Sequence, residues 1–275
     1  MLTPRSSVSL SNTLVVDERN KRLVVNGYAK DIKPALFSKQ LIDLATEKKL
    51  EKIWLWALPT DISDFLRCDF RIEGNLFRGN YEEFAVSLAY YVREVRGYSD
   101  KLQAENEILQ SVRAKPVSPL QRLPLGMELK LLDGSFAPQI SQLLSQVFTS
   151  YPSSVEKPEY IYSLIQSGNI FAGAFVQEKL IAVAAAYPDP IFNRCEMTDC
   201  ATLADFRGHC LSERLLSILE DEVQKNSLLC LYTLARAQSF SMNRVFHKLG
   251  YTYKGRLINN CHIAGSFEDM NVWVK

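Results

Sequence analysis

The sequence predicts a mixed α/β or α+β fold in which a short proline-rich linker separates two segments of domain size. Of the 275 residues, 47% are hydrophobic and 23% are charged, a balance that allows a substantial buried core. Three prolines lie close together, at Pro116, Pro119 and Pro124. Because proline fixes φ and lacks an N–H group, regular structure should stop there. We therefore expect an N-terminal α/β extension over residues 1–115, a linker over 116–126 and a C-terminal domain over 127–275.

The charge balance argues against two classes of partner. The 32 basic and 31 acidic residues leave a net charge of +1, which provides no global field to attract nucleic acid or an anionic membrane. The first residues lack the continuous apolar segment of a signal peptide, and the longest strongly apolar run, residues 180–187, is too short to span a bilayer. We expect a cytoplasmic protein that binds neither nucleic acid nor membrane.

The six cysteines are expected to be reduced thiols, because none belongs to a Cys-x-x-Cys pair and the sequence predicts no secretion. Cys210 follows His209, and His262 follows Cys261, which raises the alternative of a metal site. Adjacent residues rarely chelate one ion together, and the sequence has no second spaced pair. We therefore expect no metal.

The N-terminal extension begins with a predicted β-hairpin, because apolar residues alternate on both sides of a polar centre at residues 17–21. Further along, the patterns predict a helix over 37–46, a strand over 53–58, a short helix capped by Asp61 and continuing to Phe65, a strand over 70–77, and helical segments over 81–110 that break or bend at Gly97. This order is typical of an α/β unit.

The C-terminal domain has a more diagnostic order of elements. The patterns predict a strand over 127–132, helices over 137–148 and 159–167, strands over 170–177, 179–188 and 194–203, a helix over 210–225, a strand over 228–235, a helix over 239–249, and strands over 251–263 and 267–274. The predicted order is therefore β-α-α-β-β-β-α-β-α-β-β.

One turn in this domain favours anion binding. A strand ends near Leu203, and an amphipathic helix begins near Cys210, with Arg207 and Gly208 between them. The free amides and the dipole at a helix N-terminus attract an anion such as a pyrophosphate. A plain strand-to-helix turn is the alternative reading of these residues alone.

The order of elements and two motifs resemble the GNAT acetyltransferase superfamily. The first motif is R-G-H-C-L-S at 207–212, where Cys210 and Ser212 replace two glycines of the usual R-G-x-G-x-G pattern. The second is F-H-K-L-G-Y at 246–251, which fits the last helix and its turn. The resemblance implies a mixed, mostly antiparallel sheet flanked by helices. It also implies that acetyl-CoA is bound by Ala201, Thr202, Leu203, Arg207, Gly208, His209, Cys210, Leu211, Ser212, Asn243 and Phe246.

Four further segments look like those of the β-lysine N-acetyltransferases: 147–152 with 158–161, 196–203, and 267–273. This resemblance covers most of the chain, including the extension. It implies acetylation of the terminal amine of β-lysine to give N-acetyl-β-lysine, a compatible solute. Residues 65–74 are similar to the end of a last GNAT helix and its turn, which suggests that the extension is a degenerate half-GNAT unit.

Acetyl transfer to an amine needs a base, an oxyanion donor and an acid. Glu196 is our first candidate for the base, on the strand that resembles the family's fourth. Asp199 is the second, and its odd offset should place it on the opposite face of the strand. A structural ion pair or a contact with the substrate ammonium is the alternative role of Glu196. A backbone N–H near 201–203 is the expected oxyanion donor.

The acid is harder to assign. Phe246 stands where many GNAT enzymes carry a tyrosine, and it has no proton to give. We take Tyr251 as the candidate acid. Tyr232, Tyr253 or solvent are the alternatives.

On the acceptor side we expect Tyr151, in the loop between the first two helices, together with Arg194 and Asn260. Three alternatives stay open: another small amine or polyamine, a protein lysine, or a non-catalytic acyl-CoA-binding module. The extension is apolar enough to cover the acceptor site as a wall or to form the surface of a homodimer.

Overall fold

A single twelve-stranded sheet runs through the protein in the computed structural model, which describes residues 14–29, 31–77, 85–117, 119, 122–225 and 230–275. The order of the strands is β1-β2-β3-β5-β4-β11-β12-β10-β9-β8-β7-β6. Their bounds are β1 Leu14–Asp17, β2 Arg22–Val25, β3 Lys52–Ala57, β4 Arg71–Asn75, β5 Val86–Tyr91, β6 Met127–Leu132, β7 Ile170–Val176, β8 Lys179–Asp189, β9 Arg194–Thr202, β10 Cys230–Arg236, β11 Thr252–Ile263 and β12 Ser266–Val274. The sheet is mixed and mostly antiparallel, as expected.

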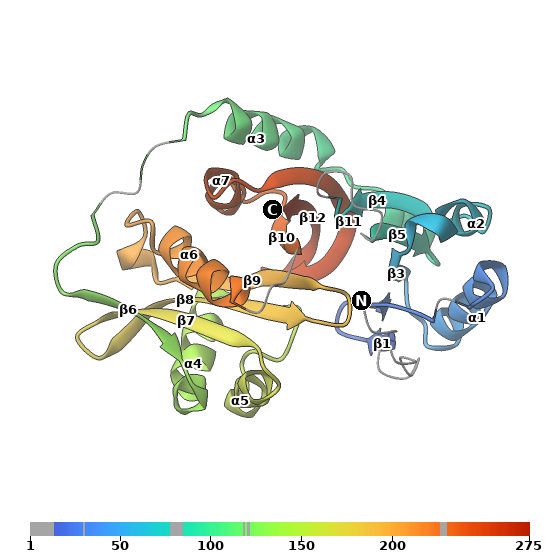
Figure 1. Cartoon of the computed structure of the whole chain (residues 1–275). Helices are drawn as coiled ribbons and strands as arrows, with labels where there is room; N and C mark the ends of the chain where they lie inside the picture. The colour runs from blue at the N-terminus through green and yellow to red at the C-terminus, as the bar shows by residue number, and fades with distance from the viewer. Residues whose placement is uncertain (1–13, 30, 78–84, 118, 120–121, 226–229) are drawn as a thin grey trace.

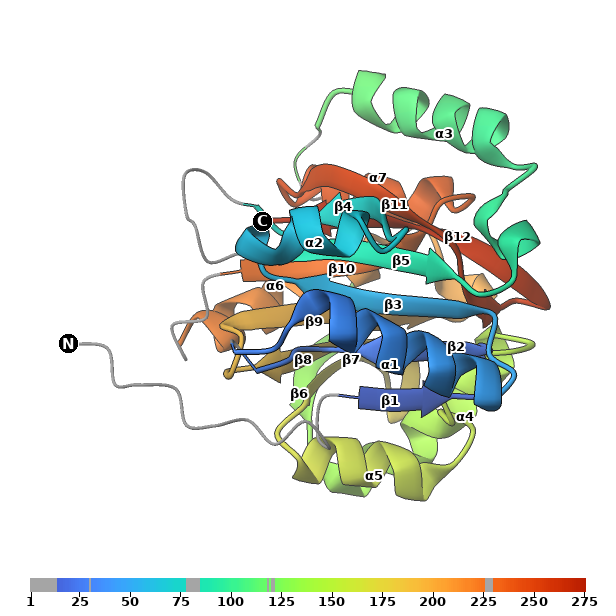
Figure 2. The same cartoon turned by 90° about the vertical axis from the view of Figure 1, so that its right-hand side faces the viewer.

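The helices lie on both sides of this sheet. They are α1 Pro34–Glu47, α2 Ile62–Leu66, α3 Leu102–Ala114, α4 Ala137–Val147, α5 Pro158–Gln166, α6 Leu211–Gln224 and α7 Phe240–Lys248. In Figure 1, α6 lies above strands β7 to β9, whereas α4 and α5 lie below them. Helices α1 and α2 cover the outer side of the N-terminal strands, in front of β3 and β5 in Figure 2.

The two ends of the sheet repeat one topology. The N-terminal strands follow the order β1-β2-β3-β5-β4, and the strands β8-β9-β10-β12-β11 follow the same order. In each repeat the second and third strands are parallel, and the other neighbours are antiparallel. A helix follows the second strand and another follows the third, α1 and α2 in one repeat and α6 and α7 in the other. This correspondence supports the half-unit interpretation of the extension.

The two repeats join where β4 pairs with β11, through Gly74 opposite Gly255. A Cβ atom on Gly255 would lie 2.2 Å from the carbonyl oxygen of Glu73, and the φ of Gly255 is +145°. The close approach of the two backbones therefore requires glycine at this position. The sheet is continuous across the expected domain boundary.

An apolar core lies between the repeats in addition to the core of each. On β2 and β3, alternate residues such as Leu23 and Ile53 pack under α1 and α2. Val24, Trp54 and Trp56 point to the opposite face and pack with residues of β10, β11 and β12. The ring of Trp56 lies 5.7 Å from that of Tyr232. The N-terminal repeat thus covers part of the C-terminal sheet.

Most predicted elements are confirmed, but two predictions for the extension were wrong. Residues 86–91 form strand β5, which pairs with β3 along its whole length, and do not continue a helix. A short apolar run fits either a buried strand or a buried helix, so its periodicity could not decide. Asp61 makes no capping bond; its carboxylate accepts a hydrogen bond of 2.9 Å from the hydroxyl of Tyr28. Residues 81–84 and 228–229 lie outside the described residues.

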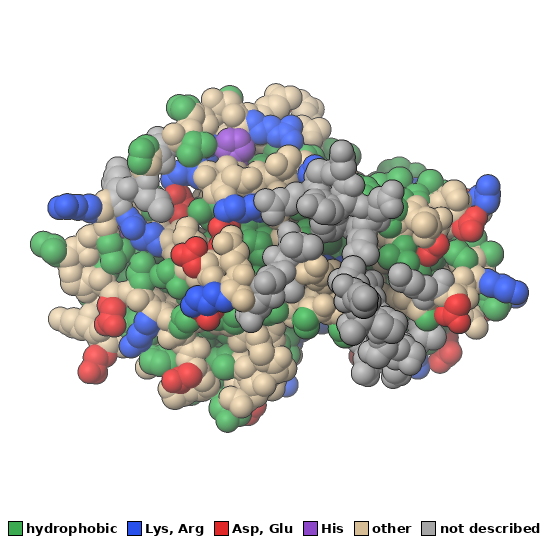
Figure 3. Space-filling model, viewed as in Figure 1, with side chains coloured by type: hydrophobic (Ala, Val, Ile, Leu, Met, Phe, Trp, Pro, Cys, Tyr) green, Lys and Arg blue, Asp and Glu red, His purple; other side chains and the backbone are tan. Residues whose placement is uncertain are grey.

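The described surface carries both signs of charge. On the face shown in Figure 3, Lys and Arg side chains are interspersed with Asp and Glu. No helix among the described residues is both long enough and apolar enough to cross a membrane.

Candidate active site

The turn between β9 and α6 presents a row of backbone amides. Gly208 and Cys210 both have left-handed φ angles, +89° and +55°. The first α-helical bond of α6 runs from the amide of Arg214 to the carbonyl of Cys210, at 3.2 Å. The amides of residues 211–213 therefore have no acceptor within the helix. A left-handed turn leading into a helix N-terminus forms an anion-binding concavity, which fits a pyrophosphate.

The side chains at this turn differ in their exposure. Arg207 and His209 are exposed, and Nε of Arg207 donates to the carbonyl of Thr202 at 3.3 Å. Leu211 is buried, and Ser212 is half-buried in the first turn of α6. The buried carboxylate of Glu213 would repel a phosphate, but Nζ of Lys248 lies 2.5 Å from it and offsets its charge.

Strands β9 and β10 diverge as β9 approaches this turn, which opens a gap in the sheet. They pair only from Arg194 with Cys230 to Glu196 with Tyr232, although β9 continues to Thr202. The amide of Leu203 donates to Ile181 at 3.0 Å and is therefore not available as an oxyanion donor.

The alternating directions of the backbone N–H groups along β9 leave one of residues 201–203 as a donor that faces this gap. Leu203 bonds toward β8, so the alternating backbone also turns Ala201 toward β8 and leaves the N–H of Thr202 on the side of the gap. The exposed guanidinium of Arg207 lies at the carbonyl of the same residue. Thr202 is therefore the candidate donor among residues 201–203.

Two carboxylates lie together at the point where the strands separate. The hydroxyl of Tyr232 donates to Glu196 at 3.3 Å. The hydroxyls of Tyr151 and Tyr187 donate to the two oxygens of Asp199, the first at 2.6 Å. Tyr187 is the cross-strand partner of Glu196, so these two side chains share one face of the sheet. Because Tyr187 also reaches Asp199, both carboxylates lie on that face.

The prediction that Asp199 faces away from Glu196 was therefore wrong. Between the pairs Val183–Ala201 and Ala185–Thr198, β9 has one residue more than β8. Asp199 lies in this β-bulge with φ of +50°. A bulge interrupts the two-residue alternation of a strand and re-aims the side chain.

Burial raises the pKa of both carboxylates. Burial, reinforced by the negative charge of Asp199, raises the pKa of Glu196 to about 7. The hydrogen bond from Tyr232 and the charges of Arg22 and Arg194 act in the opposite direction. Burial also raises the pKa of Asp199, against the hydrogen bonds from Tyr151 and Tyr187. A base with a pKa near 7 is matched to proton transfer at neutral pH.

Tyr251, the candidate acid, lies apart from this carboxylate cluster. Its ring packs edge-to-face on Phe246 of α7 at 5.3 Å, and burial, reinforced by the charge of Glu220 in α6, raises its pKa. It therefore lies on the side of the sheet covered by α6 and α7. Tyr232 contacts Glu196, and burial together with the charge of Glu196 raises its pKa well above the usual value. Tyr232 thus holds its proton at neutral pH.

Asn243 and Phe246 are both buried, which does not support their expected contact with the cofactor. The carboxamide of Asn243 makes all four of the hydrogen bonds available to it. It donates to the carbonyls of Arg236 and Ser239 and accepts from Asn271 and Trp273. It therefore ties the start of α7 to β10 and β12.

The remaining acceptor-side candidates differ in how their side chains are used. Arg194 is buried; it pairs with Asp189 at 3.1 Å and donates to the carbonyl of Asn26 at 2.8 Å. Asn260 is 1% exposed, and among the described residues its carboxamide has no hydrogen-bond partner. A buried carboxamide without a partner is costly unless a ligand or water satisfies it.

A cavity of about 400 Å³ opens beside Tyr151, between α4, the loop that follows it and His262 of β11. Arg19 from the N-terminal hairpin and Glu156 line it and form an ion pair of 3.1 Å. Arg19, Arg22 and Tyr187 were not among the predicted site residues. For Tyr187 the sequence offered one indication of a role in the site: it lies in a predicted strand next to the one that carries Glu196. Among the described residues, no group of His, Cys, Asp or Glu is arranged to hold a metal ion.

Known proteins are similar to this chain in sequence. The model of the acetyltransferase (GNAT) family matches residues 137–251. N-acetyltransferase YodP of Bacillus subtilis is 34% identical, over 100% of this chain and 99% of that protein. Beta-lysine N(6)-acetyltransferases of Methanococcus maripaludis and Methanosarcina mazei are each 29% identical, over 98% and 84% of this chain and 97% and 93% of those proteins. The chain belongs to the GNAT acetyltransferase family and is an acetyl-CoA-dependent N-acetyltransferase.

Proposed function

We propose that this N-acetyltransferase acetylates the terminal amine of β-lysine and that the product, N-acetyl-β-lysine, serves as a compatible solute. The observation that carries the proposal is the pair of neighbouring carboxylates, the half-buried Glu196 and the buried Asp199, on a sheet face that the N-terminal repeat partly covers. The two relatives that are named beta-lysine N(6)-acetyltransferases support this choice, because their similarity extends over the N-terminal repeat as well.

In the proposed reaction, acetyl-CoA supplies an activated acetyl thioester, and the protein moves the protons. A lysine-type ammonium has a pKa near ~10.4 and must lose a proton before it can attack. Glu196 accepts that proton at its carboxylate, and Asp199 adds negative charge that attracts the ammonium. The N–H of Thr202 faces the gap and is the proposed donor to the carbonyl oxygen. As the C–N bond forms and the C–S bond breaks, Tyr232 is the proposed source of the proton for the leaving thiolate, and it regains a proton from the second N–H that the nitrogen releases on becoming an amide.

The enclosure of the carboxylates favours a small acceptor over a lysine on a protein surface. The N-terminal repeat contacts the β8–β9 turn, where Arg194 donates to the carbonyl of Asn26 at 2.8 Å. The ring of Phe192 lies so close to Gly27 that a Cβ atom there would be 1.8 Å from it. A folded protein would have to displace this wall to bring a lysine to Glu196.

For the rest of the acceptor we propose contacts with Tyr151 and with the carboxamide of Asn260, which is free to bond a carboxylate or an ammonium. Arg194 is already engaged with Asp189 and with the N-terminal repeat. Its proposed role is therefore to hold the wall of the site.

The test combines isothermal titration of acetyl-CoA with release of the free CoA thiol over a panel of amines: β-lysine, α-lysine, spermidine and a lysine-containing peptide. We expect β-lysine to give the highest kcat/KM, and NMR of the product to show the acetyl group on the terminal nitrogen. The Glu196→Gln variant is the control, because it should bind acetyl-CoA as the native enzyme does while losing turnover.

Two results would contradict the proposal. Release with spermidine but none with β-lysine would exclude β-lysine as the acceptor. Binding of acetyl-CoA without thiol release on any amine would indicate an acyl-CoA-binding module.

A further inference from the structure

The tip of the β1–β2 hairpin in the N-terminal repeat reaches the acceptor loop of the C-terminal domain. This tip comprises residues 17–21, and the acceptor loop, residues 148–157, connects α4 to α5. The two segments lie more than 120 residues apart in the sequence but are joined by several hydrogen bonds. The contact therefore couples the repeat to a segment that borders the carboxylates.

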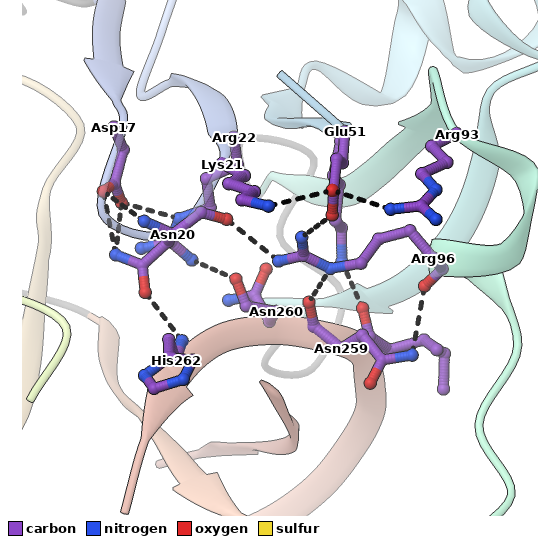
Figure 4. A network of polar contacts seen from close by, with 12 residues as sticks. Asp17, Asn20, Lys21, Arg22, Glu51, Arg93, Arg96, Asn259, Asn260 and His262 are labelled. Atoms are coloured by element: carbon purple, nitrogen blue, oxygen red, sulfur yellow. Dashed lines mark hydrogen bonds and ion pairs between the residues drawn. The ribbon is translucent and has the colours of Figure 1, made fainter. Parts of the chain in front are cut away.

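Asn20 is the centre of this contact and has no exposed surface. Its Nδ2 donates to the carboxylate of Asp17 and, at 3.0 Å, to the carbonyl of Pro152. Its Oδ1 accepts from the amide of His262 on β11 at 2.7 Å. Figure 4 shows Asn20 between Asp17 and His262. One side chain thus joins the hairpin tip, the acceptor loop and β11.

Arg19 continues the same contact at the surface. Its Nη1 donates to the carbonyls of Tyr151 and Ser153 at 3.1 and 2.6 Å. With the bond from Asn20 to Pro152, three consecutive carbonyls of the acceptor loop are held by the hairpin tip. Loop backbone in this stretch forms no helix or strand. Its conformation there depends on partners from elsewhere in the fold.

The hairpin tip is itself firmly supported. The buried guanidinium of Arg96 donates to the backbone carbonyl of Asn20 at 2.9 Å and pairs with Glu51 at 2.7 Å. The same guanidinium donates to the carbonyl of Asn259 at 2.8 Å (Figure 4). The tip therefore belongs to a polar network that spans both repeats and can hold the loop in a fixed position.

The acceptor loop carries Tyr151, whose hydroxyl donates to Asp199 at 2.6 Å. The position of the three carbonyls fixes the backbone from which this side chain projects. We propose that Asn20, assisted by Arg19, is a positioning residue through which the N-terminal repeat holds Tyr151 against Asp199 and so completes the acceptor side of the site. The inference rests on the proposed acceptor side at Tyr151 and Asp199. It gives the degenerate repeat a role in the reaction beyond that of a wall.

Steady-state kinetics test this role, with the best acceptor found in the amine panel, whatever its identity. We expect Asn20→Ala to raise the KM for the amine at least tenfold and to leave the KM for acetyl-CoA within twofold. Asn75→Ala is the matched control, because Asn75 also belongs to the N-terminal repeat and donates to a carbonyl of β11, at 3.5 Å from Lys254, but does not contact the acceptor loop. It should leave both KM values unchanged.

A double-mutant cycle with Tyr151→Phe separates positioning from a general loss of structure. If Asn20 acts through Tyr151, Asn20→Ala should add less than twofold to the effect of Tyr151→Phe. Full additivity would overturn the proposal. If Tyr151→Phe alone leaves the KM for the amine unchanged, the proposed acceptor side fails and the positioning role fails with it. An effect of Tyr151→Phe without one of Asn20→Ala overturns the positioning role only.

Hydrogen exchange gives a test that needs no acceptor. We expect amides in residues 148–157 to exchange at least tenfold faster in Asn20→Ala, with no change in α6. If Asn20→Ala fails to fold, Arg19→Ala serves instead, because Arg19 is half-exposed and can be removed without opening the core. Arg67→Ala, an exposed arginine of the same repeat paired with Asp64, is its control. Unchanged exchange in the acceptor loop would overturn the proposal.

Discussion

The two repeats have the same topology, but their parallel strands separate early only in the C-terminal repeat. In the N-terminal repeat the parallel strands β2 and β3 pair along the whole of β2, ending with Val25 opposite Leu55. In the C-terminal repeat the corresponding ladder ends at Glu196 opposite Tyr232, and β9 continues without this partner. The last rung is apolar and buried in one repeat, whereas in the other it carries a carboxylate and a hydroxyl in contact.

The turns that follow these parallel strand pairs also differ between the two repeats, in how the next helix begins. Helix α1 begins at Pro34, which has no N–H group, after an extended residue at Lys33. Helix α6 begins after the left-handed residues Gly208 and Cys210, which direct amides outward. One topology can therefore serve either as a packed wall or as a cofactor site. The gap between strands and the conformation of a single turn make the difference.

The largest effect on turnover should come from changing the polar strand pair, Glu196 opposite Tyr232. Glu196→Gln removes the proposed base, so turnover at pH 8 should fall by roughly 10²–10⁴-fold. The native kcat/KM should fall as the pH drops below about 7, because Glu196, whose pKa lies near 7, becomes protonated. The variant should lack this acidic limb. Rates of thiol release between pH 5.5 and 9 measure both effects.

The matching rung of the other repeat provides the control. Leu55→Ala removes a fully buried side chain and should cost about 2–5 kcal/mol of stability. At a temperature where the variant remains folded, its kcat/KM should fall at the same acidic pH as that of the native enzyme. A variant of Glu196 that kept full turnover at neutral pH would exclude this residue as the base.

The next effect tests the turn. Gly208→Ala places a Cβ atom on a residue with φ of +89° and should cost about 1–2 kcal/mol of stability. Because the strained turn would re-aim the amides, we expect the KM for acetyl-CoA to rise about tenfold. Titration of acetyl-CoA and thermal unfolding measure the two consequences.

Gly168→Ala is matched to this change. Gly168 has φ of +94°, and a Cβ atom at either glycine would have no neighbour within 4 Å. The control should therefore lose similar stability and keep its KM for acetyl-CoA. An equal rise in KM for both variants would show that strain alone, and not the amides at 208–213, weakens binding.

The smallest effect concerns Cys210, which occupies a glycine position of the usual family pattern with φ of +55°. Cys210→Gly should relieve about 1 kcal/mol of left-handed strain and lower the KM for acetyl-CoA by up to about threefold. Lys49→Gly, at φ of +54° after α1 of the other repeat, should relieve similar strain without changing that KM. A higher KM in Cys210→Gly would mean that the thiol side chain contributes to binding.

Much of the fold follows from local patterns. The hairpin at 14–25 and the amphipathic helix α6 are visible as alternations with periods of two and about 3.6 residues, and both are confirmed. Strand β5 was missed because its six residues are too few for either period to stand out. The order of elements around residues 207–212 was enough to identify the family and its cofactor, which the relatives confirm.

The site itself depends on features that act at longer range. A bulge in β9 places Asp199 on the face of Glu196, and the register with β10 brings Tyr232 to that carboxylate. Bulges and registers depend on neighbouring strands, so a two-residue alternation cannot reveal them. Tyr251 packs on Phe246 away from these carboxylates, and its role as the acid stays a prediction.

The sequence by itself determined the family, the order of the elements in the C-terminal domain and the turn that fits a pyrophosphate, because each of these depends on residues close together in the chain. Only the tertiary structure decided which side chains meet at the acceptor side and what the N-terminal repeat covers. The bond from Asn20 to Pro152 crosses 132 residues of sequence. Contacts of this kind arise from packing two repeats on one continuous sheet, and no local pattern encodes them.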